Sequence, residues 1–347
     1  MTNIYNNLKE CGIVTSIMEK HGGHFVISLD FELYWGMFDK VTLAEYGDHI
    51  LGERTAIPRM LMLFKEYGIH ATWATVGMIM ARNKQELLSL LPPEHLRPTY
   101  ADMRISAYTH LATASVGDDE THDIYHFGND LVRLIQRVPY QEIGNHTFSH
   151  FYCIDGNHND ASVFAADLAA FARIAQTYDI VAHSIVFPRN QMNEEALRVC
   201  AEKGIIAYRG NESHFLYKPR TDAAQTNLVR AFRLVDHYLN LSGHHTYPLP
   251  TRTPGIPLNI PASRFLRPFM PQLKLLEPLR LRRIKKSMTH AAKRGEVFHL
   301  WWHPHNFGIH QEENFRNLED ILLHFAALQK KYGMQSASMS DLSNLVT

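Results

Sequence analysis

The feature of this 347-residue sequence that most constrains its fold is the alternation of short apolar segments with helical segments. The apolar segments are rich in β-branched and aromatic residues, which is typical of buried strands. We predict strands at residues 25–31, 69–77, 140–146, 183–187, 204–210 and 296–303. We predict helices at residues 55–67, 130–138, 163–175, 193–204, 272–294 and 314–332. Strands that alternate with helices form parallel βα units, and about six such units favour a closed or distorted barrel over an open sheet.

The length is compatible with two average domains, but α/β barrels of this size commonly form one unit. We therefore predict a single domain over residues 1–347. Two irregular regions, residues 93–128 and 211–270, are expected to be long loops or caps. Loops at the carboxyl ends of parallel strands are where ligands bind in such folds, so we expect the functional site there.

Charge and cysteine content argue against several classes of protein. Basic and acidic residues both number 35, so no global field attracts nucleic acid or an anionic membrane. The three cysteines (Cys11, Cys153 and Cys200) include no Cys-x-x-Cys, which argues against a disulfide framework and a thiolate zinc site. The first residues lack the pattern of a signal peptide, and no run of about 18 apolar residues occurs. We therefore expect a cytoplasmic protein without a transmembrane segment.

Three predicted strand ends carry acidic residues or histidines. The first is SLDFE, in which Asp30 and Glu32 are two residues apart. In an extended chain such residues point to the same side, so one carboxylate could bind a cation while the other accepts a proton. A surface carboxylate pair or a helix cap is the alternative.

The second strand end is EIGNHTFSH, in which His146 and His150 are four residues apart. A helical turn after Asn145 would direct both imidazoles to one side, as two ligands of one metal require. The spacing alone is weak, because 22 histidines produce such pairs by chance, and His299 and His303 form another.

The third strand end is HLWWHPH, which places His303 and His305 after a strand of large apolar residues. A histidine there suits general acid catalysis, because its pKa lies near neutrality. A histidine packed beside the two tryptophans is the alternative. Two histidines and one carboxylate around an open position form a hydrolytic metal site, and the three strand ends together could supply one.

With these motifs in this order, the sequence resembles the polysaccharide deacetylases (NodB homology domain, carbohydrate esterase family four) over roughly residues 24–340. The resemblance also covers GIHATWATVG (68–77) and YGMQSASMSDLS (332–343). It implies a distorted (β/α) barrel of about seven parallel strands and a divalent metal such as zinc. It also implies removal of an N-acyl group from an amino sugar.

The resemblance carries roles onto matching positions of this chain. It implies that Asp30 is the base, that His146 and His150 are metal ligands, and that His303 is the acid. Most members have adjacent aspartates in the first motif, whereas Glu32 follows Asp30 by two residues here. In relatives with that spacing the second acid is the third metal ligand, which implies Glu32. The reverse assignment of the two carboxylates stays open.

An arginine is expected to hold the base carboxylate ionised. The third motif, VFPRNQ, has Pro188 before Arg189, the reverse of many relatives. Arg189 is the first candidate for this partner and Arg209 of YRGNE is the second, with a structural salt bridge as the alternative for both. Expected substrate contacts come from Trp35, Asn145, Arg209 and His305, with closure of the barrel end as the alternative for Trp35.

These features together predict a metal-dependent deacylase that removes acetyl or formyl from a nucleotide-linked, lipid-linked or nascent sugar chain. The expected setting is synthesis of a surface polysaccharide such as O-antigen or capsule, with no nucleic-acid partner. The rivals are a hydrolase of non-sugar linear or cyclic amides and an inactive carbohydrate-binding barrel. The basic run LRLRRIKK (279–286) could approach diphosphate or phospholipid groups, although such a run is more often the solvated face of a helix.

Overall fold

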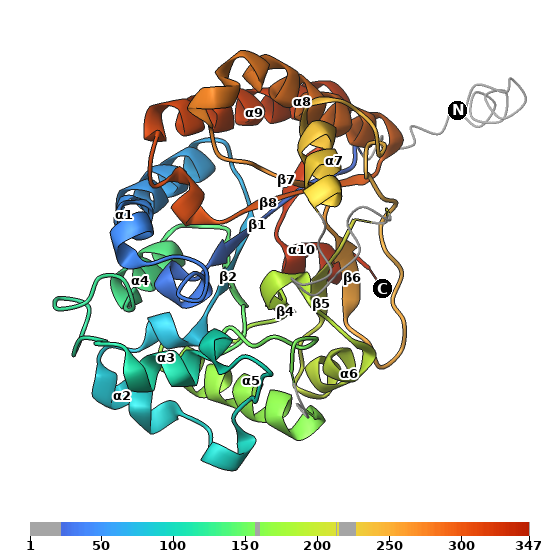
Figure 1. Ribbon diagram of the computed structural model, residues 1–347. Helices are drawn as coiled ribbons and strands as arrows, with labels where there is room; N and C mark the ends of the chain where they lie inside the picture. Colours follow the sequence, from blue (N-terminus) through green and yellow to red (C-terminus); the bar gives the residue numbers. More distant parts are fainter. Residues whose placement is uncertain (1–21, 157–159, 213, 215–226, 347) are drawn as a thin grey trace, which may run out of the picture.

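The computed structural model describes residues 22–156, 160–212, 214 and 227–346 (Figure 1). Its described strands form a nine-stranded sheet in which every pairing is parallel, in the order β6-β5-β4-β3-β2-β1-β8-β7, with β9 also paired to β1. The strands are β1 (His24–Phe31), β2 (Ala71–Thr75), β3 (Gln141–Asn145), β4 (Ser184–Ile185), β5 (Ala207–Gly210), β6 (Leu258–Pro261), β7 (Arg264–Phe265), β8 (Val297–Trp302) and β9 (Gln335–Ala337).

The sheet curls until its two edges meet. The edge strands β6 and β7 are consecutive in the chain and are separated only by Ala262 and Ser263. The backbone N–H of Ala262 donates to Gly210 O of β5, and that of Ser263 donates to His299 O of β8. The chain itself therefore joins the edges, which confirms the predicted distorted (β/α) barrel.

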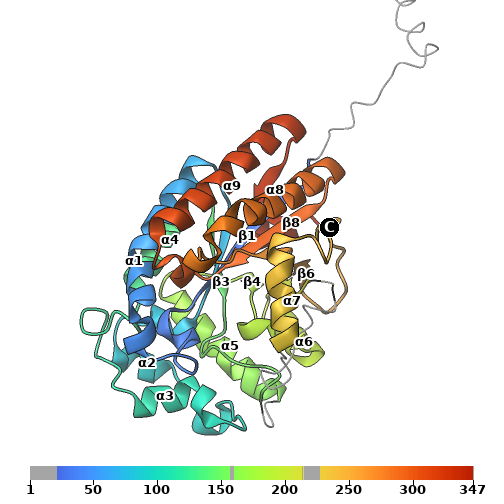
Figure 2. The same ribbon diagram turned by 45° about the horizontal axis from the view of Figure 1, so that its top comes forward.

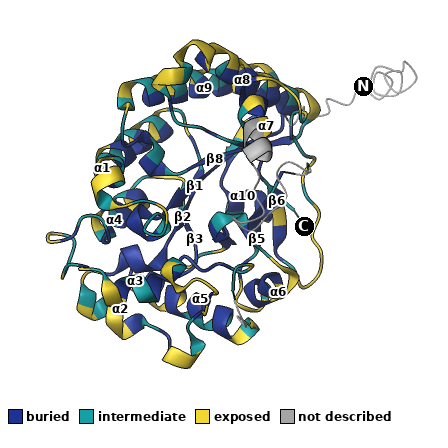
Figure 3. Ribbon diagram, viewed as in Figure 1, coloured by how far each residue is buried: buried dark blue, intermediate teal, exposed yellow. Residues whose placement is uncertain are grey.

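Helices cover the outside of the curled sheet (Figure 1), and the exposed residues lie mainly on their outer faces (Figure 3). The α-helices are α1 (Leu43–Glu66), α2 (Lys84–Leu90), α3 (Ala107–Thr113), α4 (Asn129–Arg137), α5 (Ala161–Gln176), α6 (Glu194–Glu202), α7 (Asn227–Tyr238), α8 (Glu277–Arg294), α9 (Gln311–Tyr332) and α10 (Met339–Asn344). Short 3-10 helices are η1 (Leu33–Gly36), η2 (Gly77–Met80), η3 (Glu94–Leu96), η4 (Met103–Ile105), η5 (Pro188–Asn190), η8 (Pro271–Leu276) and η9 (Pro304–Phe307).

Strand β1 lies at the centre of the molecule, because it pairs with β2, β8 and β9. All eight of its residues are buried. Helices α8 and α9 pack side by side over this part of the sheet, as Figure 2 shows. A strand enclosed on both sides holds the residues at its carboxyl end in fixed positions, and Asp30 and Glu32 lie at that end.

The element boundaries differ from the prediction in several places. Helix α1 begins at Leu43 rather than at residue 55, because Thr42 and Glu45 form a capping box there. Pro58 lies inside α1 without ending it. The region 93–128 contains η3, η4 and α3, and the described part of 211–270 contains α7, β6 and β7, so neither region is only loop.

Among the residues with described positions, no helix is both long enough and apolar enough to cross a membrane. Residues 1–21, which include Cys11 and the segment tested above for a signal peptide, lie outside the described part of the chain.

Candidate active site

The side chain of Glu32 lies at the centre of a buried cluster of four histidines. Its Oε2 atom lies 3.1 Å from Nε2 of His150 and 3.4 Å from Nε2 of His146. Its Oε1 atom lies 3.3 Å from Nε2 of His305 and 3.7 Å from Nε2 of His303. The histidine pairs from the ends of β3 and β8 therefore meet at the two oxygens of one carboxylate.

The orientation of His146 fits this cluster to a cation. Its Nδ1 atom lies 2.8 Å from the carbonyl oxygen of Val186, which can only accept a hydrogen bond. Nδ1 therefore carries a proton, and the Nε2 atom of the ring faces Glu32. His150 is oriented by the hydroxyl of Tyr152, 3.0 Å from its Nδ1. Imidazole nitrogens that converge on a carboxylate, with hydrogen bonds that fix the rings from behind, are typical of metal ligands.

The turn that brings His146 and His150 together is irregular, so the prediction of a helical turn is wrong. Thr147 and His150 have positive φ angles of 62° and 55°, a conformation that non-glycine residues seldom adopt. Asp167 of α5 stabilises the turn, because its carboxylate accepts the backbone N–H groups of Phe148 at 2.6 Å and Ser149 at 3.2 Å. Burial raises the pKa of Asp167 to about 6, against the opposing effect of these hydrogen bonds.

Asp30 has a cationic partner of its own. Arg209 of β5 donates two hydrogen bonds to its carboxylate, at 2.6 and 2.8 Å. The guanidinium is held in turn by the hydroxyl of Ser28 at 3.1 Å, by Oδ1 of Asn190 at 2.9 Å and by the ring of Trp301 at 4.1 Å. Burial would raise the pKa of Asp30, but the charge of Arg209 outweighs it and lowers the pKa. Asp30 is therefore ionised at neutral pH.

His303 is the most open member of the histidine cluster. Its side chain is 24 % exposed, against 1 % for His146 and 4 % for His150. Its Nε2 atom also lies 3.7 Å from Oδ2 of Asp30, so it faces both carboxylates. Burial lowers the pKa of His303, against the nearby negative charges. The pKa of Glu32 is well below its ordinary value, because contacts with the histidines outweigh burial.

Arg189 does not contact Asp30, so the first candidate for the base's partner is corrected to the second, Arg209. The Arg189 guanidinium forms an ion pair with Asp39 and lies 3.7 Å from Asp155. It also lies 4.1 Å from the centre of the Tyr152 ring. The reversed Pro-Arg order leaves Arg189 in η5 with a positive φ of 53°, and its side chain supports the Tyr152 side of the site instead.

The structure places the four residues expected to contact substrate as follows. Trp35 is fully buried and its indole N–H donates to His126 O at 2.8 Å, so it has no exposed ring face on which a sugar could stack. Asn145 is buried and its Oδ1 accepts the backbone N–H of Thr147 at 2.6 Å, which shapes the turn. Arg209 holds Asp30, and His305 belongs to the cluster around Glu32.

Several supporting residues were missed by the sequence analysis. Ser28 lies two residues before Asp30 on β1, so strand alternation could have placed it on the same side. It also contacts His299, whose Nε2 lies 2.8 Å from the Ser28 hydroxyl and whose pKa burial lowers to about 3. Tyr46 of α1, which contacts Nδ1 of His305 at 2.9 Å, and Asn190 of η5 carry no comparable signal, since their contacts join residues far apart in the sequence or on different elements.

No protein-family profile and no curated protein matches the sequence. Solved structures do match. A protein described as a polysaccharide deacetylase from Mycobacterium smegmatis is 14 % identical, with a TM-score of 0.56, over 94 % of this chain and 91 % of that one. A second so described, from Pseudomonas aeruginosa PAO1, is 11 % identical with a TM-score of 0.53 over 94 % and 91 % of the two chains. An allantoinase, Puue, is 10 % identical with a TM-score of 0.54 over 94 % and 90 %.

At these identities the matches concern the fold. The chain has the barrel fold found in polysaccharide deacetylases, in agreement with the resemblance noted from its motifs.

Proposed function

We propose that this protein is a metal-dependent hydrolase that removes an N-acyl group from an amino sugar. The observation that carries the proposal is the convergence of the Nε2 atoms of His146 and His150 on the Glu32 carboxylate, beside a second carboxylate that Arg209 keeps ionised. Two histidine nitrogens and a carboxylate are a ligand set that suits a divalent cation, and the ionised Asp30 next to them can serve as a base.

Glu32, His146 and His150 would hold a divalent metal, most simply zinc, which prefers nitrogen and carboxylate ligands in this number. A second set, Glu32 with His303 and His305, is also close enough. We favour the first set because the His146 tautomer is fixed and because His303 is the ring that is open to a substrate. When bound, such a metal polarises a carbonyl group and lowers the pKa of water.

Asp30 and His303 would then divide the proton transfers. A water molecule attacks the acyl carbon and gives a proton to Asp30, whose ionised form Arg209 stabilises. The carbon–nitrogen bond breaks as the nitrogen takes a proton from the protonated form of His303. The products are the carboxylic acid and the amine of the sugar, and the proton on Asp30 then passes to His303, which restores both groups. The Nε2 atom of His303 lies 3.7 Å from Oδ2 of Asp30, so the acid and the base are close enough to act on the same amide group.

We also propose the finer expectations of the sequence: an acetyl or formyl group on a nucleotide-linked, lipid-linked or nascent chain for surface polysaccharide, acted on in the cytoplasm by a single-domain protein. The fold shared with proteins described as polysaccharide deacetylases supports the sugar. A comparable fold similarity to an allantoinase makes non-sugar amide hydrolysis the second candidate.

Metal content tests the proposal first. Elemental analysis of the purified protein should give about one divalent ion per chain, and His146→Ala/His150→Ala should lose it. A matched control is His95→Ala/His183→Ala, which removes two exposed histidines and should retain the ion. The metal-loaded protein should release acetate or formate from N-acyl amino sugars.

Each other outcome favours a different reading. Release of amine from cyclic or linear amides but not from N-acyl sugars would move the assignment to the second candidate. A protein that takes up no zinc, cobalt or nickel and binds sugar without hydrolysis would be an inactive carbohydrate-binding barrel.

A further inference from the structure

Helix α8 concentrates positive charge in a protein whose net charge is zero. Its 18 residues include one acidic residue, Glu277, and seven basic ones. The basic residues are Arg280, Arg282, Arg283, Lys285, Lys286, Lys293 and Arg294. Such an excess on one outer helix creates a local positive potential that the whole-chain balance conceals.

Four of these cations have acidic partners. The pairs are Arg280 with Glu277 at 2.5 Å, Arg283 with Asp236 at 3.5 Å, Lys285 with Asp320 at 2.5 Å and Arg294 with Glu296 at 2.6 Å. Arg282, Lys286 and Lys293 form no ion pair or hydrogen bond with a residue in the described part of the chain, and all three are exposed. The uncompensated charge of α8 therefore belongs to these three side chains.

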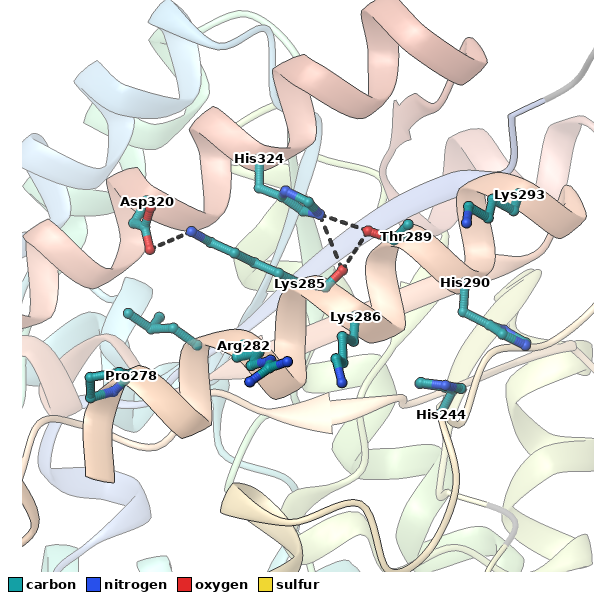
Figure 4. A pocket seen from close by; sticks show the side chains of 11 residues that line it. His244, Pro278, Arg282, Lys285, Lys286, Thr289, His290, Lys293, Asp320 and His324 are labelled. Carbon is teal, nitrogen blue, oxygen red and sulfur yellow. Dashed lines mark hydrogen bonds and ion pairs between the residues drawn. The ribbon is translucent and has the colours of Figure 1, made fainter. Parts of the chain in front are cut away.

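The three unpaired cations share one face of α8. At about 100° per residue, the spacings of four and seven residues place Arg282, Lys286 and Lys293 within about 40° of one another. They line a surface groove of about 700 Å³, to which His244, His290 and His324 also contribute. Figure 4 shows the three cations along the helix without contacts, whereas Lys285 reaches Asp320 of α9.

Exposed leucines continue this face toward the start of the helix. Leu279 lies three residues before Arg282 and is 40 % exposed. Leu275, in the preceding η8, is 92 % exposed. Two exposed leucines beside three unpaired cations combine apolar area with positive charge, a pattern typical of helices that lie at the surface of an anionic membrane. If this face were only in contact with water, or bound a soluble polyanion, the exposed leucines would have no role.

We propose that the surface formed by Leu275 of η8 and by Leu279, Arg282, Lys286 and Lys293 of α8 docks on a membrane surface that contains anionic phospholipid. The leucines would enter the headgroup region while the cations contact lipid phosphates. The cations that line the groove complement the charge of lipid phosphates. The leucines add an apolar contact that a membrane can accept and a soluble polyanion cannot.

The direction of α8 relates this face to the candidate active site. Helix α8 ends at Arg294 and the chain enters β8 at Val297, so helix and strand run in opposite directions. The start of α8, with Leu279 and with Leu275 of η8 just before it, therefore lies toward the carboxyl end of β8, where His303 lies. Docking through the leucines would bring the mouth of the barrel close to the lipid. The docking itself does not depend on the proposed reaction.

Vesicle flotation tests the proposal on the full chain. The protein should float with phosphatidylcholine vesicles that contain about 30 % phosphatidylglycerol and remain behind with pure phosphatidylcholine, and salt should release it. The variant Arg282→Gln/Lys286→Gln/Lys293→Gln should partition roughly 100-fold more weakly, since each basic side chain near an anionic surface contributes on the order of fivefold. Leu275→Ser/Leu279→Ser should also bind these vesicles more weakly.

A matched control removes the same charge elsewhere. Lys65→Gln/Arg137→Gln/Lys203→Gln changes exposed cations on or beside α1, α4 and α6, and it should float like the wild type. Equal loss in the two triple variants, or equal binding to neutral vesicles, would overturn the proposal. Retention on heparin that the α8 variant loses, without vesicle binding, would overturn it also, because the face would then serve a soluble polyanion. Circular dichroism of each variant confirms that it is folded.

Discussion

The Asp30 and Glu32 sides of the candidate site differ in how a buried carboxylate is accommodated. Both residues are 3 % exposed and they are two positions apart on the same chain segment. Asp30 is neutralised within the protein by two hydrogen bonds from Arg209. Glu32 has no arginine or lysine within ion-pair distance among the described residues and is surrounded by histidine nitrogens instead.

The difference separates a carboxylate whose charge is already compensated from one that can accept a cation. Taking a carboxylate out of water is costly, and the cost is recovered only by a well-placed partner. Arg209 supplies that partner permanently for Asp30. Histidine nitrogens face Glu32 instead, and under the proposed function a metal ion would supply the positive charge on the Glu32 side. On this basis the open question of which carboxylate is the ligand favours Glu32.

The largest expected effect comes from removing the charge of Glu32. Glu32→Gln preserves the shape of the side chain but removes the one anionic donor of the metal site. We expect metal content to fall to background and hydrolysis to fall by a factor on the order of a thousand or more, because the proposed metal would lower the pKa of the attacking water and polarise the carbonyl group. Elemental analysis and an acyl-release assay measure the two effects. If the Glu32→Gln protein kept its full metal content, Glu32 would not be the carboxylate that binds the metal.

Asp30→Asn should separate the two carboxylates. The amide cannot accept a proton from water, so we expect kcat to fall by about 10²- to 10⁴-fold while the metal content stays near that of the wild type. The variant is measured beside Glu32→Gln in the same two assays. Loss of metal from Asp30→Asn, with retention in Glu32→Gln, would reverse the roles given to the two residues.

The two arginines provide the next test. Arg209→Met leaves Asp30 buried without its cation, and removing one partner of a buried ion pair typically costs about 3–5 kcal/mol in the free energy of unfolding. Arg189→Met is the matched control, and we expect a smaller loss. Its side chain is 19 % exposed, and Asp39 keeps Lys40 at 3.8 Å. Urea unfolding of the metal-free proteins measures both. Equal losses would mean that Arg209 is no more specific a partner than Arg189.

Much of the fold could be predicted because it depends on local patterns. Asn193 caps α6 through the N–H of Ala196, and Gly204, with a φ of 78°, follows its end, as their residue types indicate. The beginning of α1 was missed because its capping box lies ahead of the apolar pattern that was used to find the helix. Pairing of the barrel edges depends on contacts across the chain, which no local pattern specifies.

The candidate site likewise has parts that local sequence patterns predict and parts that depend on long-range contacts. The histidines and carboxylates lie at strand ends, and strand alternation places Asp30 and Glu32 on one side. The orientation of His146 depends on Val186, forty residues away, and the partner of Asp30 on an arginine from β5. Such long-range contacts explain why Arg189 was preferred to Arg209 from the sequence.

Glu53 of α1 is another buried carboxyl group, and it can be compared with Asp30 and Glu32. Of the variants considered, one at Glu53 has the smallest expected effect. It is fully buried and neither of its oxygens has a hydrogen-bond partner in the described structure. Burial raises its pKa well above the ordinary value of 4.5, and the negative charge of Glu32 adds to the shift. The charge of Arg54 opposes this shift only in part, so this carboxyl group stays protonated where Asp30 and Glu32 are ionised.

The sign of the resulting pH dependence follows from proton uptake. Below pH 4.5 Glu53 is protonated in both the folded and the unfolded chain and has no effect. Above that value the unfolded chain loses the proton while the folded protein keeps it, so stability falls as pH rises, until pH passes the folded-state pKa.

Glu53→Gln removes this contribution. The variant should gain on the wild type by up to about 1.4 kcal/mol per pH unit within that window. Urea unfolding of both metal-free proteins at pH 5, 6 and 7 measures the difference, since other titrating groups cancel between them. A constant difference across these values would mean that Glu53 is ionised in the folded protein, and the contrast between partnered and unpartnered carboxylates would then fail.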